Sequence, residues 1–448
     1  MKILKLLSFF IFLGSINLAN ASVNIEIKND EIAKTKILFV GFESNDFAIN
    51  NEAKQIFQKI TYNLKTTNLV EVFALNKLSS NNQQNIDTSL IQTIDINQIP
   101  DFDKYNNTNI DALIMAQFSH DPIGNLEIRI RMWDLLDRKQ TFGKYYSTSP
   151  DNYHRTANTI SDEIYKSITG ENTGHFNSQI TYVTETGNYR NRIRKISLID
   201  FDGENFRNLT DGSEMVLTPI FSKKRDEIYF LRYFQGRPQI FSLNTKTLRT
   251  QKIGGFRGTT LAPAIHPKYS DKILLTAIEN GNSDIHELNI GQNFAKKLTK
   301  SSAIDTTASY SPDGNSIVFI SDRDGTQQIY TMNLETLSQT KISNGEGSYS
   351  KPMWSPDGKL IAFSKQKGNN FFVGTMTPSG KGEKLLTSAY LVEGAKWSPN
   401  GRYLIYSKKR SPYGIQSIPR IFTIDIITGF EYEIPTPREQ GAIDPDWI

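Results

Sequence analysis

The sequence contains no cysteine and only five histidines, and these shortages exclude several classes of protein. Without cysteine the 448-residue chain has no disulfides, no thiolate nucleophile, no zinc site with thiolate ligands and no lipid-modified N-terminal cysteine. The histidines never take the H-E-x-x-H spacing of a metalloprotease, and no G-x-S-x-G nucleophile turn occurs. We therefore expect no catalytic residues, no metal site and no cofactor.

The chain also lacks a large charge of one sign and a long apolar run. Lys plus Arg number 51 and Asp plus Glu 47, so the net charge of +4 argues against a nucleic-acid-binding protein. The apolar run Leu6–Leu18 would span only about 20 Å as a helix, short of the roughly 30 Å hydrocarbon core of a membrane. Lys2 and Lys5 precede this run, and Ala19-Asn20-Ala21 follows it. This pattern predicts a signal peptide over residues 1–21, cleaved between Ala21 and Ser22, and hence an exported protein.

A repeat in the C-terminal 60% of the chain predicts the architecture. The phrase aromatic-Ser-Pro-Asp-Gly, followed by an alternating apolar run, recurs with a period near 44 residues. Short strands separated by turn signals at this period are typical of β-propeller blades of four strands each. The Ser-Pro-Asp-Gly turns are interpreted as structural turns between strands and not as functional sites. The residues that align before these turns are expected to be buried blade anchors: Phe221, Tyr310, Trp354, Trp397 and Trp447.

The two ends of the repeat region predict how the ring closes. The set that begins at Ile180 lacks its own anchor strand, and Asp444-Pro445-Asp446-Trp447-Ile448 repeats the form of that missing strand. We therefore expect a six-bladed β-propeller over residues 178–448, whose first blade is completed by the C-terminal strand. Residues 22–172 alternate strand and helix patterns, which predicts an α/β N-terminal domain.

The blade pattern also indicates a recognition face. The Ser-Pro-Asp-Gly turns are tight, whereas the longer and more variable connections lie on the opposite rim, and loops on a rigid scaffold often bind partners. Ordinary variable loops are the alternative interpretation. The residues that we expect around the mouth of the central channel are Thr259, Thr260, Asp305, Thr306, Thr307, Ser348, Tyr349, Ser350 and Glu393.

A signal peptide, an α/β domain, blades of the form Pro352-Met353-Trp354-Ser355-Pro356-Asp357-Gly358 and a terminal Asp-Pro-Asp-Trp-Ile together resemble the TolB family, the periplasmic component of the Tol-Pal system. The resemblance implies a non-enzymatic scaffold, monomeric alone, that acts in outer-membrane integrity and constriction during cell division. It also implies that the propeller face binds the peptidoglycan-associated lipoprotein Pal. The mature N-terminal segment would bind TolA.

The positions that match this segment are Ser22, Val23, Asn24, Ile25, Glu26 and Ile27. Their alternation suits addition to the edge of a partner's sheet, and an ordinary edge strand of the α/β domain is the alternative.

Two other classes of function stay open. A secreted propeller hydrolase or lyase would need converging acidic or histidine side chains, and Asp305, Glu393 and Asp444 are the candidates. A propeller that binds glycan or peptidoglycan would need exposed aromatic residues on the rim, and Tyr349 and Tyr390 are the candidates.

Overall fold

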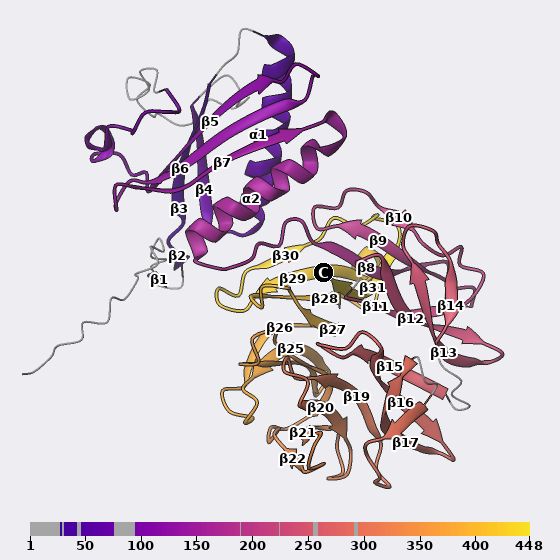
Figure 1. Ribbon diagram of the computed structural model, residues 1–448. Helices are drawn as coiled ribbons and strands as arrows, with labels where there is room; N and C mark the ends of the chain where they lie inside the picture. Colours follow the sequence, from indigo (N-terminus) through magenta and orange to yellow (C-terminus); the bar gives the residue numbers. More distant parts are fainter. Residues whose placement is uncertain are drawn as a thin grey trace, which may run out of the picture.

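The computed structural model describes residues 27–28, 31–42, 46–75, 95–188, 190–223, 225–253, 259–290 and 294–448. The predicted signal peptide, its cleavage site at Ala21 and Ser22, and the segment through Glu26 lie outside the described residues. Figure 1 shows an α/β part, coloured indigo to magenta, beside a ring of sheets that runs from magenta to yellow. The expected combination of an α/β domain and a β-propeller is therefore confirmed.

The α/β part is built on a five-stranded sheet with the strand order β4-β3-β5-β6-β7. β3 pairs in parallel with β4 and β5, whereas β5, β6 and β7 form antiparallel pairs. The elements of this part are β1 (Ile27–Lys28), β2 (Glu31–Ile32), β3 (Thr35–Phe42), α1 (Phe47–Thr66), β4 (Val70–Leu75), η2 (Phe102–Tyr105), β5 (Ala112–His120), β6 (Leu126–Asp134), β7 (Lys139–Thr148), η3 (Pro150–Asn152) and α2 (Tyr153–Thr169).

Local signals in the sequence set the ends of both long helices. The Asp46 carboxylate caps α1 by accepting a hydrogen bond from the Ala48 amide at 2.8 Å. The helix then buries an apolar stripe against the sheet: Ala53, Ile56, Phe57, Ile60 and Leu64. The second helix begins with the 3₁₀ turn η3 and becomes α-helical at Tyr153. It ends at Gly170, whose φ of 73° is the left-handed conformation that glycine adopts readily at a helix C-terminus.

Six four-stranded antiparallel sheets form the ring, as the repeat predicts. The strands of the first blade are β31 (Gly441–Trp447), β8 (Gln179–Thr186), β9 (Ile193–Asp200) and β10 (Arg207–Asn208). The strands of the second and third blades are β11 (Val216–Phe221), β12 (Glu227–Phe234), β13 (Arg237–Asn244), β14 (Thr250–Lys252), β15 (Thr259–Ile265), β16 (Lys272–Glu279), β17 (Asn282–Asn289) and β18 (Phe294–Lys297).

The fourth, fifth and sixth blades repeat this order of four successive strands. Their strands are β19 (Asp305–Tyr310), β20 (Ser316–Ser321), β21 (Gln328–Asn333), β22 (Gln339–Lys341), β23 (Ser348–Trp354), β24 (Ile361–Lys367), β25 (Asn370–Met376), β26 (Lys384–Ala389), β27 (Leu391–Trp397), β28 (Tyr403–Lys409), β29 (Arg420–Asp425) and β30 (Glu431–Glu433); η5 (Ile415–Ser417) precedes β29.

The closing strand is the one that the sequence predicts. β31 pairs antiparallel with β8, with Trp447 opposite Ile180 and Gly441 opposite Glu185. The pairing joins the last strand in chain order to the first strand of the propeller. It thereby removes two sheet edges that would otherwise be open to aggregation.

The blade anchors pack between neighbouring blades. Phe221, Tyr310, Trp397 and Trp447 are buried, whereas Trp354 is only partly buried. Two of the tryptophans also tie blades together, because Trp397 Nε1 donates to the Met353 carbonyl at 3.0 Å and Trp447 Nε1 donates to the Trp397 carbonyl at 2.7 Å. Each bond reaches from one blade to the innermost strand of the preceding one.

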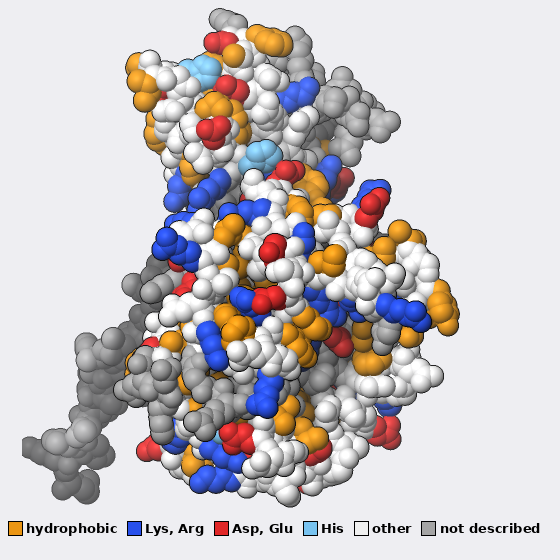
Figure 2. Space-filling model, turned by 90° about the vertical axis from the view of Figure 1, so that its right-hand side faces the viewer, with side chains coloured by type: hydrophobic (Ala, Val, Ile, Leu, Met, Phe, Trp, Pro, Cys, Tyr) orange, Lys and Arg blue, Asp and Glu red, His pale blue; other side chains and the backbone are white. Residues whose placement is uncertain are grey.

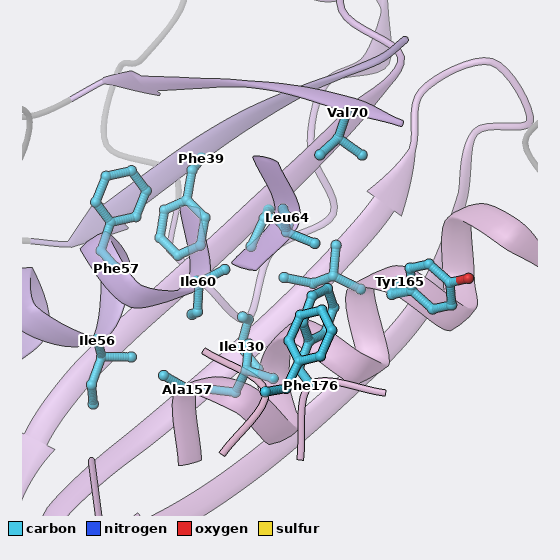
Figure 3. Packing of buried hydrophobic residues seen from close by; sticks show 14 of the residues in the cluster. Phe39, Ile56, Phe57, Ile60, Leu64, Val70, Ile130, Ala157, Tyr165 and Phe176 are labelled. Carbon is cyan, nitrogen blue, oxygen red and sulfur yellow. The ribbon is translucent and has the colours of Figure 1, made fainter. Parts of the chain in front are cut away.

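The two parts of the molecule share one hydrophobic core. Figure 3 shows Tyr165 and Phe176 beside residues of the α/β part such as Ile130 and Ala157. The same cluster continues through Phe201 to residues of the first and sixth blades. Polar contacts reinforce this junction, since the Lys59 ammonium lies 2.5 Å from the buried Asp202 carboxylate.

The α/β part therefore contacts the tight-turn end of the ring. Tyr403, two residues after the Ser-Pro-Asn-Gly turn of the sixth blade, packs its ring 6.4 Å from that of Tyr165 in α2. The Tyr62 and Tyr432 hydroxyls are 2.6 Å apart. Among the described residues, none of these contacts between the α/β part and the propeller lies at the opposite end of the channel.

Candidate functional site at the channel mouth

The innermost strand of every blade lines a central cavity of about 580 Å³. These six strands share a break in register with the second strand of the blade, three residues before the anchor position. A β-bulge of this kind redirects a side chain at the edge of a sheet. The bulge residues that carry positive φ angles are Thr218 (45°), Thr307 (51°), Lys351 (48°), Gly394 (76°) and Asp444 (49°).

These bulge residues lie at the end of the channel opposite the tight turns, and two of them form an ion pair across the mouth. Lys351 Nζ lies 3.2 Å from Asp444 Oδ1 and 3.6 Å from Glu393 Oε2. Burial alone would lower the pKa of Lys351, but the two carboxylates outweigh burial and raise it. Burial would likewise raise the pKa of Asp444, and Lys351 together with the Thr218 backbone amide lowers it. Both side chains are therefore charged at neutral pH.

A second cavity of about 460 Å³ adjoins the mouth between the first and sixth blades. It contains more cationic than anionic side chains, and most of these are paired. Arg192 Nε and Arg194 Nη2 lie 3.3 and 2.9 Å from Glu185. Lys408 Nζ lies 2.7 Å from Glu431 Oε2. Figure 2 shows the same mixture more broadly, since basic and acidic side chains are interspersed over the visible face of the propeller.

The chemistry of this mouth suits recognition of a partner surface. Its exposed groups are hydroxyls, paired charges and backbone, with the half-exposed apolar side chains Met215 and Ile304 at the rim. In the part of the chain that the structure describes, no three His, Asp or Glu side chains come together to hold a metal ion. None of the described helices is both long and apolar enough to cross a membrane.

Comparison with known proteins identifies the family. A model described as the TolB amino-terminal domain matches residues 23–141, and one described as the TolB beta propeller domain matches residues 165–447. The chain belongs to the TolB family. The Tol-Pal system protein TolB of Gluconobacter oxydans (strain 621H) is 37% identical over 327 residues, which cover 72% of this chain and 71% of that protein.

Solved structures agree on the fold of this TolB chain. The crystal structure of TolB from Acinetobacter baumannii superposes with a TM-score of 0.77 at 23% identity, over 93% of this chain and 96% of that one. Kuenenia stuttgartiensis hydrazine synthase gives a TM-score of 0.50 at 13% identity, over 61% of this chain and 47% of that one. Since this fold also occurs in such a protein, the fold alone does not assign a function to the TolB chain.

Four of the predicted rim residues reach the mouth of this TolB propeller. Thr306, Thr307, Ser350 and Glu393 lie at or next to the bulge, and each is at least partly exposed. The Thr307 amide donates to Thr276 Oγ1 at 3.1 Å, which fixes the bulge. Ser348 is partly exposed at the start of β23. Thr259 and Thr260 begin β15, and their side chains lie outside the described part of the chain.

Two predicted rim side chains are buried, so their expected exposure is wrong. Tyr349 is 0% exposed, and its hydroxyl donates to Glu383 at 2.7 Å and accepts from Lys365 at 2.8 Å. Asp305 is also 0% exposed and forms an ion pair with Arg323 at 3.1 Å. Both occupy the position five residues before the anchor, where strand alternation turns every described side chain into the blade. The buried residues at this position are Val216, Asp305, Tyr349, Val392 and Ala442.

The sequence prediction of the rim missed Lys351 and Thr218, and it considered Asp444 only as part of an enzyme. All three occupy the bulge position, three residues before the anchor. The repeat itself contains a signal for this position, because a proline follows Thr218, Lys351 and Asp444 in turn. Alignment of the repeats on their anchors places these residues in one column whose chemistry varies from blade to blade.

Proposed function

We propose that this chain is the TolB component of the Tol-Pal envelope complex and acts as a non-enzymatic periplasmic scaffold. The propeller mouth binds Pal, and the mature N-terminal segment Ser22–Ile27 binds TolA. Through these two contacts the protein serves outer-membrane integrity and constriction during cell division. The observation that carries the proposal is the match of both TolB family models, over residues 23–141 and 165–447.

The geometry of the mouth supports the contact with Pal. The α/β part packs at the tight-turn end of the ring, so the described residues leave the other end of the channel uncovered. Thr306, Ser350 and Glu393 lie at that open end. A partner domain that docks there would meet a rigid ring of strand ends.

The two alternative functions lose most of their candidate residues. Tyr349 is buried and offers no ring to a glycan, whereas Tyr390 is 48% exposed and is left as a single aromatic candidate. Glu393 lies 3.6 Å from Lys351. Asp305 is buried against Arg323, and Asp444 is paired with Lys351, so neither carboxylate is placed as a free acid or base. We therefore favour the scaffold over a glycan-binding protein or a hydrolase.

The contact with Pal is tested by isothermal titration of the mature chain, Ser22 to Ile448, with the soluble domain of Pal. The double variant Thr306→Glu/Ser350→Glu should weaken saturable one-to-one binding by at least tenfold, because two carboxylates at the rim would be desolvated or repelled (about 1.4 kcal/mol per factor of ten). The matched control is Thr250→Glu/Thr340→Glu, on the exposed outer strands β14 and β22. Equal affinities for the two double variants would contradict the proposed face.

The contact with TolA is tested by removal of Ser22–Ile27. We expect binding to TolA to be lost while the circular dichroism spectrum and Pal binding are retained, because the segment precedes the core of the α/β part. Unchanged affinity for TolA would exclude this segment as the binding element.

A further inference from the structure

The five-stranded sheet of the α/β part ends in an open edge. β7 pairs with β6 on one side, and no other described strand pairs with it on the other. At ten residues it is long for an exposed edge, and half of its backbone N–H and C=O groups face outward. Figure 1 shows β6 and β7 in the α/β part, apart from the ring of propeller sheets. An edge of this kind is a template for an added strand.

The outer face of the sheet beside this edge is cationic. Arg129 and Arg131 lie two residues apart on β6, so both project from the face opposite the helices, about 7 Å apart. Neither forms an ion pair with a described residue. The nearby Glu127 carboxylate instead accepts hydrogen bonds from the hydroxyls of Tyr145 at 2.6 Å and Ser119 at 2.9 Å.

The glycine at position 143 brings the charge of Arg131 close to the open edge. Gly143 of β7 lies directly opposite Arg131, and Tyr145 lies opposite Arg129. Because glycine has no side chain, the space above Gly143 holds only the flexible end of the Gln140 side chain beside Arg131, and this end can move aside for a strand beyond β7. A cavity of about 360 Å³ marks this space, and its lining includes Arg129, Arg131, Gln140, Gly143 and Tyr145.

We propose that an extended acidic segment of a partner protein adds to β7 as a sixth strand. An acidic residue opposite Gly143 would reach the guanidinium of Arg131 through a charge-assisted hydrogen bond, and its neighbour two positions along would pack on the Tyr145 ring, which is 55% exposed. This surface is separate from the channel mouth.

The charges argue against a second copy of this chain as the occupant. An antiparallel pair of β7 strands that places Lys139 of one copy opposite Lys144 of the other would bring like charges together, and like charges on paired strands are destabilising. Lysine on an exposed edge is a common device against self-association. Within the chain Lys139 pairs with Asp137 at 2.8 Å and Lys144 with Glu163 at 3.9 Å, so Arg129 and Arg131 are the cations of this edge that would attract an acidic segment.

The test uses the mature full-length chain and a synthetic peptide of alternating glutamate and valine, about eight residues long. Fluorescence anisotropy of the labelled peptide measures affinity, and hydrogen exchange of residues 139–148 reports strand addition. We expect saturable binding with slowed exchange in β7.

The double variant R129E/R131E should weaken binding by at least about tenfold, as loss of hydrogen bonds to a charged group does. The matched control K65E/R155E changes two exposed cations of α1 and α2 and should bind as the wild type.

Gly143→Thr fills this space without unfolding the strand. The added Cβ would lie 2.9 Å from the flexible end of the Gln140 side chain and in ordinary van der Waals contact with Arg131 Cγ, at 3.6 Å. We expect this variant to keep its melting temperature and to bind the peptide several-fold more weakly. Equal binding of a lysine-valine peptide, or undiminished binding by R129E/R131E, would overturn an acidic occupant. Binding without slower exchange in β7 would overturn strand addition.

Discussion

The residue three positions before each blade anchor gives the channel mouth its chemistry. In five blades this residue has a positive φ, and in four of them it is not glycine: Thr218, Thr307, Lys351 and Asp444. A left-handed conformation costs a residue with a side chain roughly 1–2 kcal/mol. The bulge imposes this conformational cost on these blades. It also directs a different side chain from each of them toward the channel mouth. The mouth can therefore change its specificity without any change in the scaffold.

The Lys351–Asp444 pair predicts a pH dependence. The pKa of Asp444 is lowered in the folded protein, so its charge stabilises the fold above the pKa of the unfolded chain, about 3.9, and this stabilisation is lost as the pH falls through the folded pKa. We expect wild type to lose about 1 kcal/mol more unfolding free energy than Asp444→Asn on acidification, a small value because solvent screens the partly exposed Lys351. Urea denaturation at neutral and acidic pH measures the difference, and parallel losses would contradict it.

Trp447 is the residue whose truncation should cost most. It is 5% exposed, packs 6.2 Å from the Phe201 ring and donates to the Trp397 carbonyl. Trp447→Ala should lower the free energy of unfolding by about 3–5 kcal/mol, as large truncations in a core do. Chemical denaturation measures this cost. Trp447→Phe keeps an aromatic ring at this position but loses the indole hydrogen bond, and it should cost only about 1 kcal/mol. Similar losses of unfolding free energy for both variants would refute core packing as the main contribution.

At the scale of elements, β31 is a strand whose removal should affect the whole ring. Truncation after Asp444 removes the pairs Asp446–Thr181 and Trp447–Ile180 and leaves the first part of β8 as an open edge. We expect a lower melting temperature and a greater tendency to aggregate, because an unpaired edge strand is exposed. Thermal scanning with light scattering measures both. A truncated chain that melts with the full-length protein would refute the closure as a source of stability.

The elements also show how far the sequence predicts the fold and the site. The period near 44 residues and the anchors predict the blades and the closing strand, because strand alternation and turn chemistry are local properties. The orientation of Tyr349 and Asp305 was predicted wrongly, because the bulge between them and the anchor shifts the alternation by one residue. The pairing of Lys351 with Asp444 joins residues 93 positions apart on different blades, and no local pattern contains it.

At the scale of the whole molecule, the shared core predicts that both parts unfold together. One continuous cluster joins the α/β sheet, α2, Phe201 and residues of the first and sixth blades. Differential scanning calorimetry should therefore show a single transition for the wild-type protein. Two well-separated transitions for wild type would contradict this coupling.

The same experiment tests the contact between Lys59 and Asp202. Lys59→Met leaves the Asp202 carboxylate buried without a cation, with hydrogen bonds from the Asn158 side-chain amide at 3.4 Å and the Glu204 backbone amide at 3.0 Å, and should cost about 3 kcal/mol, as the loss of one partner from a buried pair does. We expect the transition to broaden or divide. Lys65→Met, at an exposed position of the same helix, should leave the calorimetric trace unchanged.

The closure of the ring by β31 has a consequence for the order of events during synthesis. The residues of β31 come after those of all the other blades, yet they pair with β8, the first propeller strand to be made. The second to sixth blades are contiguous in the chain and can form as it emerges, whereas the first blade stays incomplete until β31 has been made. A chain arrested before that point would leave the β8 edge open to pairing with other chains, so an unfinished copy differs from a finished one in an exposed strand edge.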